Sequence, residues 1–222
     1  MMLARYTRAI GATVVLAMLS LLIFEAYAVW DASRRTPQIL AIWLAKPQAL
    51  PLSALSAEQK DILLQVEDPA FYTHKGVDVS SPGQGMTTIT QGLVKFLYFD
   101  GFQPGFAKIE QSLIARFVLD QSLSKDQQLA LFINHAYFGS INGREVRGLA
   151  GAAEVYSGKP FDQLTRDDYI GLIAMLIGPN EVRPDNKRIF DERVSRIKAL
   201  LDGKCQPQGV FDPTYKACAT RS

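Results

Sequence analysis

Four helix-start patterns, spread over residues 55–203, constrain the fold of this chain more than any other feature. In each pattern a Ser or Thr is followed three residues later by Gln or Asp and then by an apolar run, which is how a capping box begins a helix. The four pairs are Ser56 with Gln59, Thr88 with Gln91, Ser124 with Gln127, and Thr165 with Asp168. Alternating strand patterns are nearly absent, so the sequence predicts a mainly helical, all-α domain without internal repeats.

Further helices are expected between and after these starts, because apolar residues recur there three and four positions apart. Two such stretches are KIEQSLIARFVLD, residues 108–120, and GLAGAAEVY, residues 148–156. A last long helix is expected over about residues 191–201, because Gly203 follows it as a helix-ending residue. We therefore take residues 55–203 as one domain.

An apolar segment precedes this domain and indicates that the domain is exported. Residues 9–28 read AIGATVVLAMLSLLIFEAYA, about the 20 residues that cross a hydrocarbon core as a helix. Arg5 and Arg8 precede the segment, which favours a cytoplasmic N-terminus. We expect a single pass through the cytoplasmic membrane, with the domain on the periplasmic side. Glu25, about one turn from the outer end, is expected to be solvated.

The same segment also fits a signal peptide, because residues 26–28, Ala-Tyr-Ala, match a small-residue cleavage site. Its apolar stretch is longer than the core of a usual signal peptide, so we favour an uncleaved anchor over residues 1–30. A linker is then expected over residues 31–54, where Pro47 and Pro51 lie.

Charge and cysteine content argue against several classes of protein. The formal net charge is +2 and 21% of the residues are charged, with both signs nearly balanced, which argues against a nucleic-acid partner. Cys205 and Cys218 lie in a turn-rich tail, residues 204–222, and in an exported protein they are expected to form a disulfide worth roughly 3 kcal/mol. His74 and His135 lack the spacing of zinc ligands, so no metal site is expected among the protein residues.

The most informative polar run is EDPAFYTHKGVD, residues 67–78, followed at residues 85–95 by GMTTITQGLVK. Two adjacent acids, an aromatic residue, a lone His and a Gly stand there at fixed offsets ahead of a Thr-rich helix start. This combination predicts a site for an extended polar substrate.

These residues resemble glycosyltransferase family 51, the peptidoglycan glycosyltransferases, which occur alone and as a module of class A penicillin-binding proteins. The first motif of that family, EDxxFxxHxGxD, is met at Glu67, Asp68, Phe71, His74, Gly76 and Asp78. The second, GxSTIxQQLxKN, reads GMTTITQGLVKF here, with Thr87, Gly92 and Phe96 as the departures. Two later motifs read KDQQLALFINHAYFG and GLAGAAEVYSGK. The resemblance covers about residues 55–201 and implies a lysozyme-like helical lobe.

The third motif of the family, RKxxExxxAxxLE, is where this chain departs from the pattern. Its internal Glu is the second essential carboxylate of the family. Counted back from Ser124, that position falls on Ser112, or on Gln111 if one residue is inserted, and neither is an acid. Glu110 is the nearest carboxylate and is taken as a provisional substitute, although two positions correspond to about 200° of helical rotation.

The resemblance implies an enzyme that joins lipid-linked disaccharide-pentapeptide units, lipid II, into glycan strands of the cell wall. The 4-hydroxyl of an acceptor sugar attacks the anomeric carbon of a donor sugar, and undecaprenyl pyrophosphate leaves. Glu67 corresponds to the catalytic base, and Lys95, Lys108 and Arg116 are candidates to stabilise the pyrophosphate, with Mg²⁺ or Mn²⁺ as an open alternative. The other candidate substrate-binding residues are Asp68, Phe71, His74, Thr87, Thr88, Gln91, Gln111, Ser112 and Asn134.

Two other functions remain open at this point. The broken third motif also fits a non-catalytic relative that binds lipid II or a cell-wall synthase. A lysozyme-like lobe also fits a glycan-cleaving enzyme. No second domain with a Ser-x-x-Lys segment of a transpeptidase is expected beside residues 55–203, so crosslinking is expected to need a separate penicillin-binding transpeptidase. The growing glycan strand and the membrane are the other expected partners.

Overall fold

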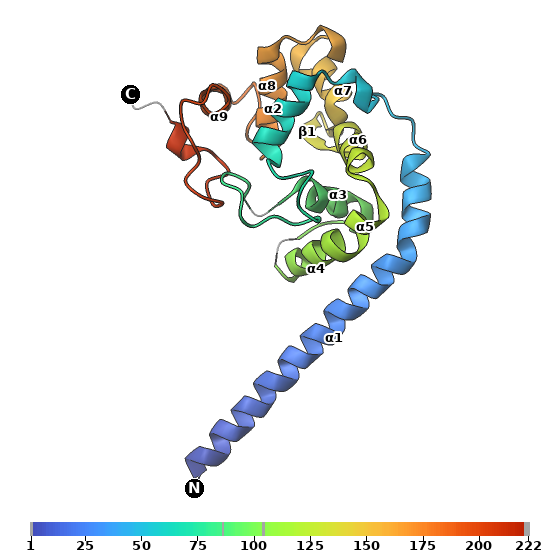
Figure 1. The fold of residues 1–222 in the computed structure, drawn as a ribbon, viewed down its shortest axis with the longest axis vertical. Helices are drawn as coiled ribbons and strands as arrows, with labels where there is room; N and C mark the ends of the chain where they lie inside the picture. Colours follow the sequence, from blue (N-terminus) through green and yellow to red (C-terminus); the bar gives the residue numbers. More distant parts are fainter. Residues whose placement is uncertain (1, 86, 104, 220–222) are drawn as a thin grey trace.

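The computed structural model describes residues 2–85, 87–103 and 105–219. Figure 1 shows a helical domain packed against the later part of one long N-terminal helix. The main elements in chain order are α1 (Met2–Leu44), α2 (Ala57–Glu67), α3 (Ile89–Tyr98), α4 (Phe106–Ile114), α5 (Asp120–Ser122), α6 (Lys125–His135), β1 (Tyr137–Ile141), β2 (Arg144–Arg147), α7 (Gly148–Ala152), α8 (Arg166–Met175) and α9 (Lys187–Leu201). The chain is π-helical over Ala115–Leu119 and Ala153–Ser157, and short 3₁₀ turns cover Leu52–Ala54, Phe161–Gln163 and Lys216–Cys218.

The four capping boxes predicted from the sequence begin α2, α3, α6 and α8, and the mainly helical fold is confirmed. At α2, the Gln59 amide donates to Ser56 Oγ at 3.1 Å and the Ser56 amide donates to Gln59 Oε1 at 2.9 Å. Each box therefore satisfies two backbone N–H groups that the first turn of a helix leaves without partners. The last helix, α9, begins at Lys187, four residues before the expected start.

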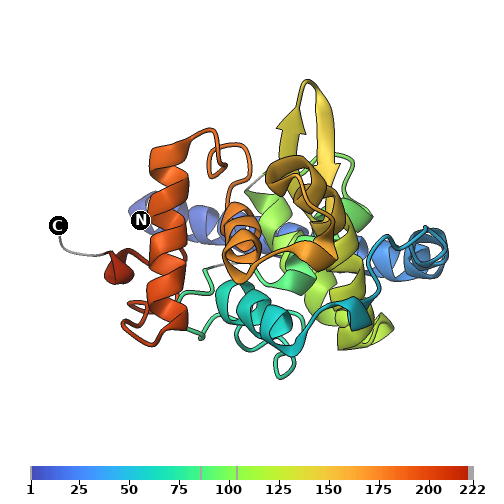
Figure 2. The same cartoon turned by 90° about the horizontal axis from the view of Figure 1, so that it is seen from above.

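A two-stranded antiparallel hairpin, β1 and β2, is a small addition to the mainly helical fold that the sequence did not predict. It projects from the helical body in Figure 2. Asn142 and Gly143 form its turn with φ of 53° and 76°, the left-handed backbone that a tight hairpin turn requires. The Asn-Gly pair was a readable hairpin signal, but the strands beside it are too short to show clear alternation.

Helix α1 continues to Leu44, so the linker expected from residue 31 is helical over its first part. Ala32, Thr36 and Leu40 lie four residues apart, and that face is buried against the domain. Thr36 Oγ1 and the Tyr98 hydroxyl of α3 share a hydrogen bond of 2.7 Å. Pro37 costs one backbone hydrogen bond, but it lies on the exposed face of the helix, so this packing outweighs the break.

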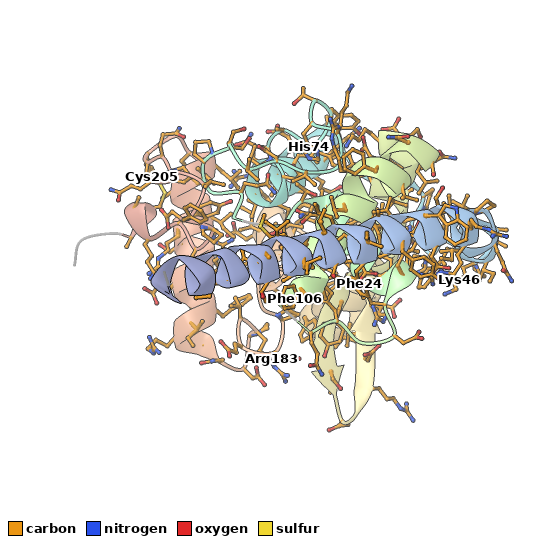
Figure 3. All side chains as sticks on the ribbon, turned by 90° about the horizontal axis from the view of Figure 1, so that it is seen from below. Phe24, Lys46, His74, Phe106, Arg183 and Cys205 are labelled. Atoms are coloured by element: carbon orange, nitrogen blue, oxygen red, sulfur yellow. A yellow bond between two sulfur atoms is a disulfide. The ribbon has the colours of Figure 1, made fainter. Side chains whose placement is uncertain are left out.

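The earlier part of α1 is compatible with a membrane anchor. A candidate membrane span covers Ile10–Leu44, with a mean hydropathy of 2.1 in its most apolar window. Large apolar side chains along it, such as Leu16 and Ile23, are exposed. Figure 3 shows α1 crossing the domain as seen from below. The prediction that Glu25 is solvated is wrong, because its side chain is buried and the residue is only 5% exposed.

The core is centred on α8, in which every residue from Tyr169 to Met175 is buried. Helices α2 and α9 pack against α8, while α6 packs against α3 and α7. This arrangement fixes the C-terminal end of α2 and the N-terminal end of α3, the two helix ends that carry the polar motifs.

One glycine in the first motif is required by a close backbone approach. Gly76 has φ of +81°, and a Cβ built there would lie 2.4 Å from the Ala115 carbonyl oxygen. We expect Gly76→Ala to lower the free energy of unfolding by about 3–5 kcal/mol. The cost of a left-handed backbone at Ala and the cost of the steric clash of its Cβ add together. Gly143→Ala is the matched control, since Gly143 has φ of +76° with open space around it, and should cost about 1–2 kcal/mol. Equal losses in denaturant titrations of the two variants would contradict this account.

Candidate active site

A cleft of about 480 Å³ lies where the C-terminal end of α2, the loop before α3, and α9 come together. Helix α6 and the start of β1 close another side of it. Side chains or backbone from both polar motifs line it, together with residues far away in sequence. The residues of interest along its wall are Glu67, Thr87, Lys95, Tyr137, Arg193 and Pro213.

Glu67 is the last residue of α2 and the acid of this cleft. Its side chain is half-buried. Burial raises its pKa from 4.5 to about 7, the nearby Arg193 guanidinium opposes this rise, and the neighbouring Asp68 adds to it. A carboxyl group with a pKa close to neutral pH can accept a proton and release it again.

Arg193 of α9 was missed from the sequence. It is buried, its Nη1 donates to the Pro213 carbonyl oxygen at 2.8 Å, and its guanidinium lies 4.4 Å from the Tyr215 ring centroid. Its charge lowers the pKa of Glu67. The only local signal was its position four residues before the buried Ile197, on the inner face of α9.

Lys95 and Lys108 place two cations beside the cleft. Lys108 Nζ donates to Thr87 Oγ1 at 2.8 Å, and Thr87 lines the cleft together with Lys95. Burial lowers the pKa of Lys95. Burial, and then the charge of Lys95, lower the pKa of Lys108 to about 8. Neither lysine forms an ion pair within the described part of the chain, so both charges are available to an anion.

Asp68, Phe71 and His74 lie behind the wall of the cleft instead of lining it. Asp68 is fully buried and its Oδ2 accepts from the amide of Ile89, the first residue of α3, at 2.9 Å. His74 Nε2 lies 2.9 Å from Asp68 Oδ1. Phe71 is 1% exposed and belongs to the core. These motif residues therefore hold the N-terminal end of α3 in place beside Glu67.

Gln91 and Ser112 join α3 to α4, because Gln91 Nε2 donates to Ser112 Oγ at 2.8 Å. Gln111 is buried, and its Nε2 donates to the Gln91 carbonyl oxygen. Thr88 Oγ1 donates to the Gly76 carbonyl oxygen at 2.7 Å and contributes to the cleft wall. Gln111 and Ser112, the two alternative positions for the second acid, thus carry an amide and a hydroxyl group that join α4 to α3.

Glu110 is not brought together with Glu67. It is half-buried, it does not line the cleft, and it lies close enough to Glu25 of helix α1 for the two carboxylates to interact electrostatically. The reason is helical geometry, since Glu110 points to the α1 side of α4 while Ser112 faces α3.

Arg116 and Asn134 also lie away from the cleft wall. Arg116 Nη1 donates to the Lys75 carbonyl oxygen at 3.1 Å. Asn134 Nδ2 donates to the Leu50 carbonyl oxygen at 2.7 Å, and its Oδ1 accepts from the Leu50 amide at 2.9 Å. Asn134 therefore holds the segment that follows α1.

A divalent ion finds no ready ligand set in the described residues, where no group of three or more His, Cys, Asp or Glu side chains could hold a metal. Glu67 is the acid of the cleft, and its charged neighbours there are cations. The described residues of the cleft therefore do not fit a divalent metal.

The mainly helical fold and the acid-bearing cleft are those of a transglycosylase domain. The chain belongs to the family described as Transglycosylase, whose profile matches residues 38–203. That match begins inside α1, so it includes part of the segment expected to be a linker. It ends before the cysteine-bearing tail.

Among known proteins, penicillin-binding protein 1B of Escherichia coli (strain K12) is 31% identical over 166 residues, 68% of this chain and 19% of that protein. Penicillin-binding protein 1A of Neisseria flavescens is 31% identical over 68% of this chain and 20% of that protein. A protein of Cupriavidus necator named "Putative transglycosylase" is 27% identical over 84% of this chain and 83% of its own length. The chain thus spans about a fifth of the penicillin-binding proteins it matches.

Proposed function

We propose that this protein is a peptidoglycan glycosyltransferase that polymerises lipid II and releases undecaprenyl pyrophosphate. One observation carries the proposal: Glu67, with a pKa of about 7, shares the cleft with Lys95 and, through Thr87, with Lys108. A base beside an anion site is what transfer from a pyrophosphate to a sugar hydroxyl requires.

Glu67 acts as the base in this reaction. A sugar hydroxyl is a weak nucleophile at neutral pH, so the Glu67 carboxylate takes its proton as the hydroxyl oxygen attacks the anomeric carbon. The new bond between sugar oxygen and carbon forms while the bond from that carbon to the phosphate oxygen breaks. The electron pair of the broken bond leaves with undecaprenyl pyrophosphate, and the proton remains on Glu67.

Lys95 and Lys108 stabilise the departing pyrophosphate. Charge accumulates on the bridging oxygen as the bond breaks, and half-buried ammonium groups act more strongly there than in water. Lys108 stays protonated at pH 7 because its pKa is about 8. Thr87 orients it by accepting a hydrogen bond from Nζ.

The domain is proposed to lie on the periplasmic side of the cytoplasmic membrane. Arg5 and Arg8 before the apolar segment favour a cytoplasmic N-terminus. The disulfide between Cys205 and Cys218 supports the same orientation, because such bonds persist in oxidising compartments. A penicillin-binding transpeptidase is the proposed partner that crosslinks the strands.

The proposal is tested by incubating the purified full chain with lipid II in detergent and separating the products by size. Glycan polymer and free undecaprenyl pyrophosphate are expected. Bound but unconverted lipid II would instead favour the non-catalytic relative, and soluble fragments released from preformed glycan would favour a cleaving enzyme. Either outcome would overturn the proposal.

The rate is expected to depend on pH through two groups. Glu67 must be unprotonated, so kcat should rise as pH passes about 7. Lys108 must be protonated, so kcat should fall as pH passes about 8. The pH profile of polymerisation should therefore be a narrow bell near neutral pH. A rate that does not change between about pH 5 and pH 7 would contradict the assignment of Glu67.

A further inference from the structure

The C-terminal tail, residues 204–219, returns from the end of α9 to the catalytic cleft. Two backbone hydrogen bonds attach it to the loop before α3: the Gly83 amide donates to Gly209 O at 2.9 Å, and the Gly85 amide donates to Val210 O at 2.8 Å. Pro213 of the tail lines the cleft itself. The tail is therefore a wall of the site, although the match to the family ends at residue 203.

Tyr215 is the anchor of this tail. It is 1% exposed, and its hydroxyl donates to the Val66 carbonyl oxygen at 2.6 Å, one residue before Glu67. Its ring stacks on the Arg193 guanidinium, and Arg193 in turn donates to Pro213 O. A single residue of the tail thus holds both the end of α2 and the cation that acts on Glu67.

The fit between the tail and the cleft loop is close. A Cβ built on Gly83 would lie 2.5 Å from Tyr215 Cε1 and 2.8 Å from Pro207 Cγ. Inside the tail, the carboxylate of Asp212 accepts from the amides of Lys216 at 2.7 Å and Ala217 at 3.2 Å. The Cys205–Cys218 disulfide closes the loop, with Cα atoms 5.3 Å apart. It joins the end of α9 to a point three residues after Tyr215.

We propose that the disulfide-closed tail is a working part of the active site, in which Tyr215 and Arg193 are positioning residues that fix the Glu67 carboxylate. Closing the disulfide in the oxidising compartment then completes the site. This inference rests on the proposed function for its effect on rate, but its effect on Glu67 can be measured without any reaction.

The groups around Glu67 shift its pKa in opposite directions, so the effect of burial and the effect of Arg193 can be measured separately. Burial raises the pKa of Glu67, while Arg193 of α9 lowers it and the adjacent Asp68 raises it. Pro213 of the tail lines the same cleft as Glu67. Lys95 of α3 lines the same cleft. Loosening the tail admits water and should lower the pKa of Glu67, whereas removing the charge of Arg193 should raise it.

The test compares the native full chain with the Cys205→Ser/Cys218→Ser double variant and with Tyr215→Phe. In both variants kcat should fall roughly threefold to tenfold with little change in KM, because the base is misplaced while the rest of the cleft persists. The rising limb of the pH profile should move to lower pH in the double variant. Arg193→Gln should move it to higher pH, and Arg193→Lys should restore it. Reductant should reproduce the effect in the native chain and change nothing in the double variant.

The same shifts should be seen by ¹³C NMR titration of the Glu67 carboxyl group, assigned by comparison with Glu67→Gln. If the native chain makes no polymer and the NMR titration still shifts, the proposed function fails and the positioning role stands. If the native chain polymerises lipid II, and loss of the disulfide moves neither the pH profile nor the titration, the tail is only a structural clamp and the inference is overturned. A fraction of globally unfolded molecules would lower kcat without moving the pH profile, and in the NMR titration it would appear as a second Glu67 signal with a pKa near 4.5.

Discussion

Replacing Glu67 by Gln should lower kcat by roughly 10² to 10⁴-fold, because the amide cannot take the proton of the attacking hydroxyl. The side chain keeps its size, so binding of lipid II should be almost unchanged. The measurement is polymer formation at saturating lipid II, with binding followed separately. Glu154→Gln is the matched control, since Glu154 is exposed and lies away from the cleft, and it should polymerise at the native rate.

The loss of activity in Glu67→Gln should not come from loss of the fold. The pKa of Glu67 is raised from 4.5 to about 7 on folding, so its stabilising contribution is fully present below about pH 4.5 and is lost as pH rises through about 7. At neutral pH the charge on the half-buried Glu67 carboxylate disfavours the folded state, and Gln removes that charge. A Tm equal to or above that of the native chain is therefore expected, and a clearly lower Tm would argue that Glu67 has a structural role.

Removing the cations should give the second large loss. Lys108→Ala is expected to lower kcat by roughly 10² to 10³-fold, because the departing pyrophosphate loses a charge aimed at it in a partly dry site. Lys95→Ala should act similarly. The double variant should lose less than the product of the two single losses, since the charge of Lys95 lowers the pKa of Lys108 and the two effects are coupled.

Lys187→Ala is the control for the lysine variants, because Lys187 is exposed on α9 and paired with Asp191. It should leave polymerisation unchanged. Lys108→Arg should recover part of the rate, since the charge is kept while the contact with Thr87 is altered. If Lys108→Ala raised KM alone, Lys108 would bind the ground state and would not stabilise the leaving group.

The helices were predictable because the information for them is local. In each capping box, the side chain of one residue accepts a hydrogen bond from the backbone N–H of its partner three positions away. Each of the four pairs began a helix. The length of α1 was not predictable, because Thr36 and Leu40 are held by packing on the domain, and composition alone placed a linker there. The hairpin depended on one Asn-Gly turn within short strands.

The sequence was enough to identify Glu67, Lys95 and Lys108 as candidates, because motifs of a known family can be counted along the chain. It could not tell which motif residues face the cleft, since Asp68 and His74 turn toward the N-terminus of α3 and toward each other. Nor could it show that Arg193 and Tyr215 meet near Glu67, because their contact joins α2, α9 and the tail across more than a hundred residues. Helix starts and motif residues are local properties, whereas the pKa of an acid depends on burial and neighbouring charges, which only the packing of distant segments can supply.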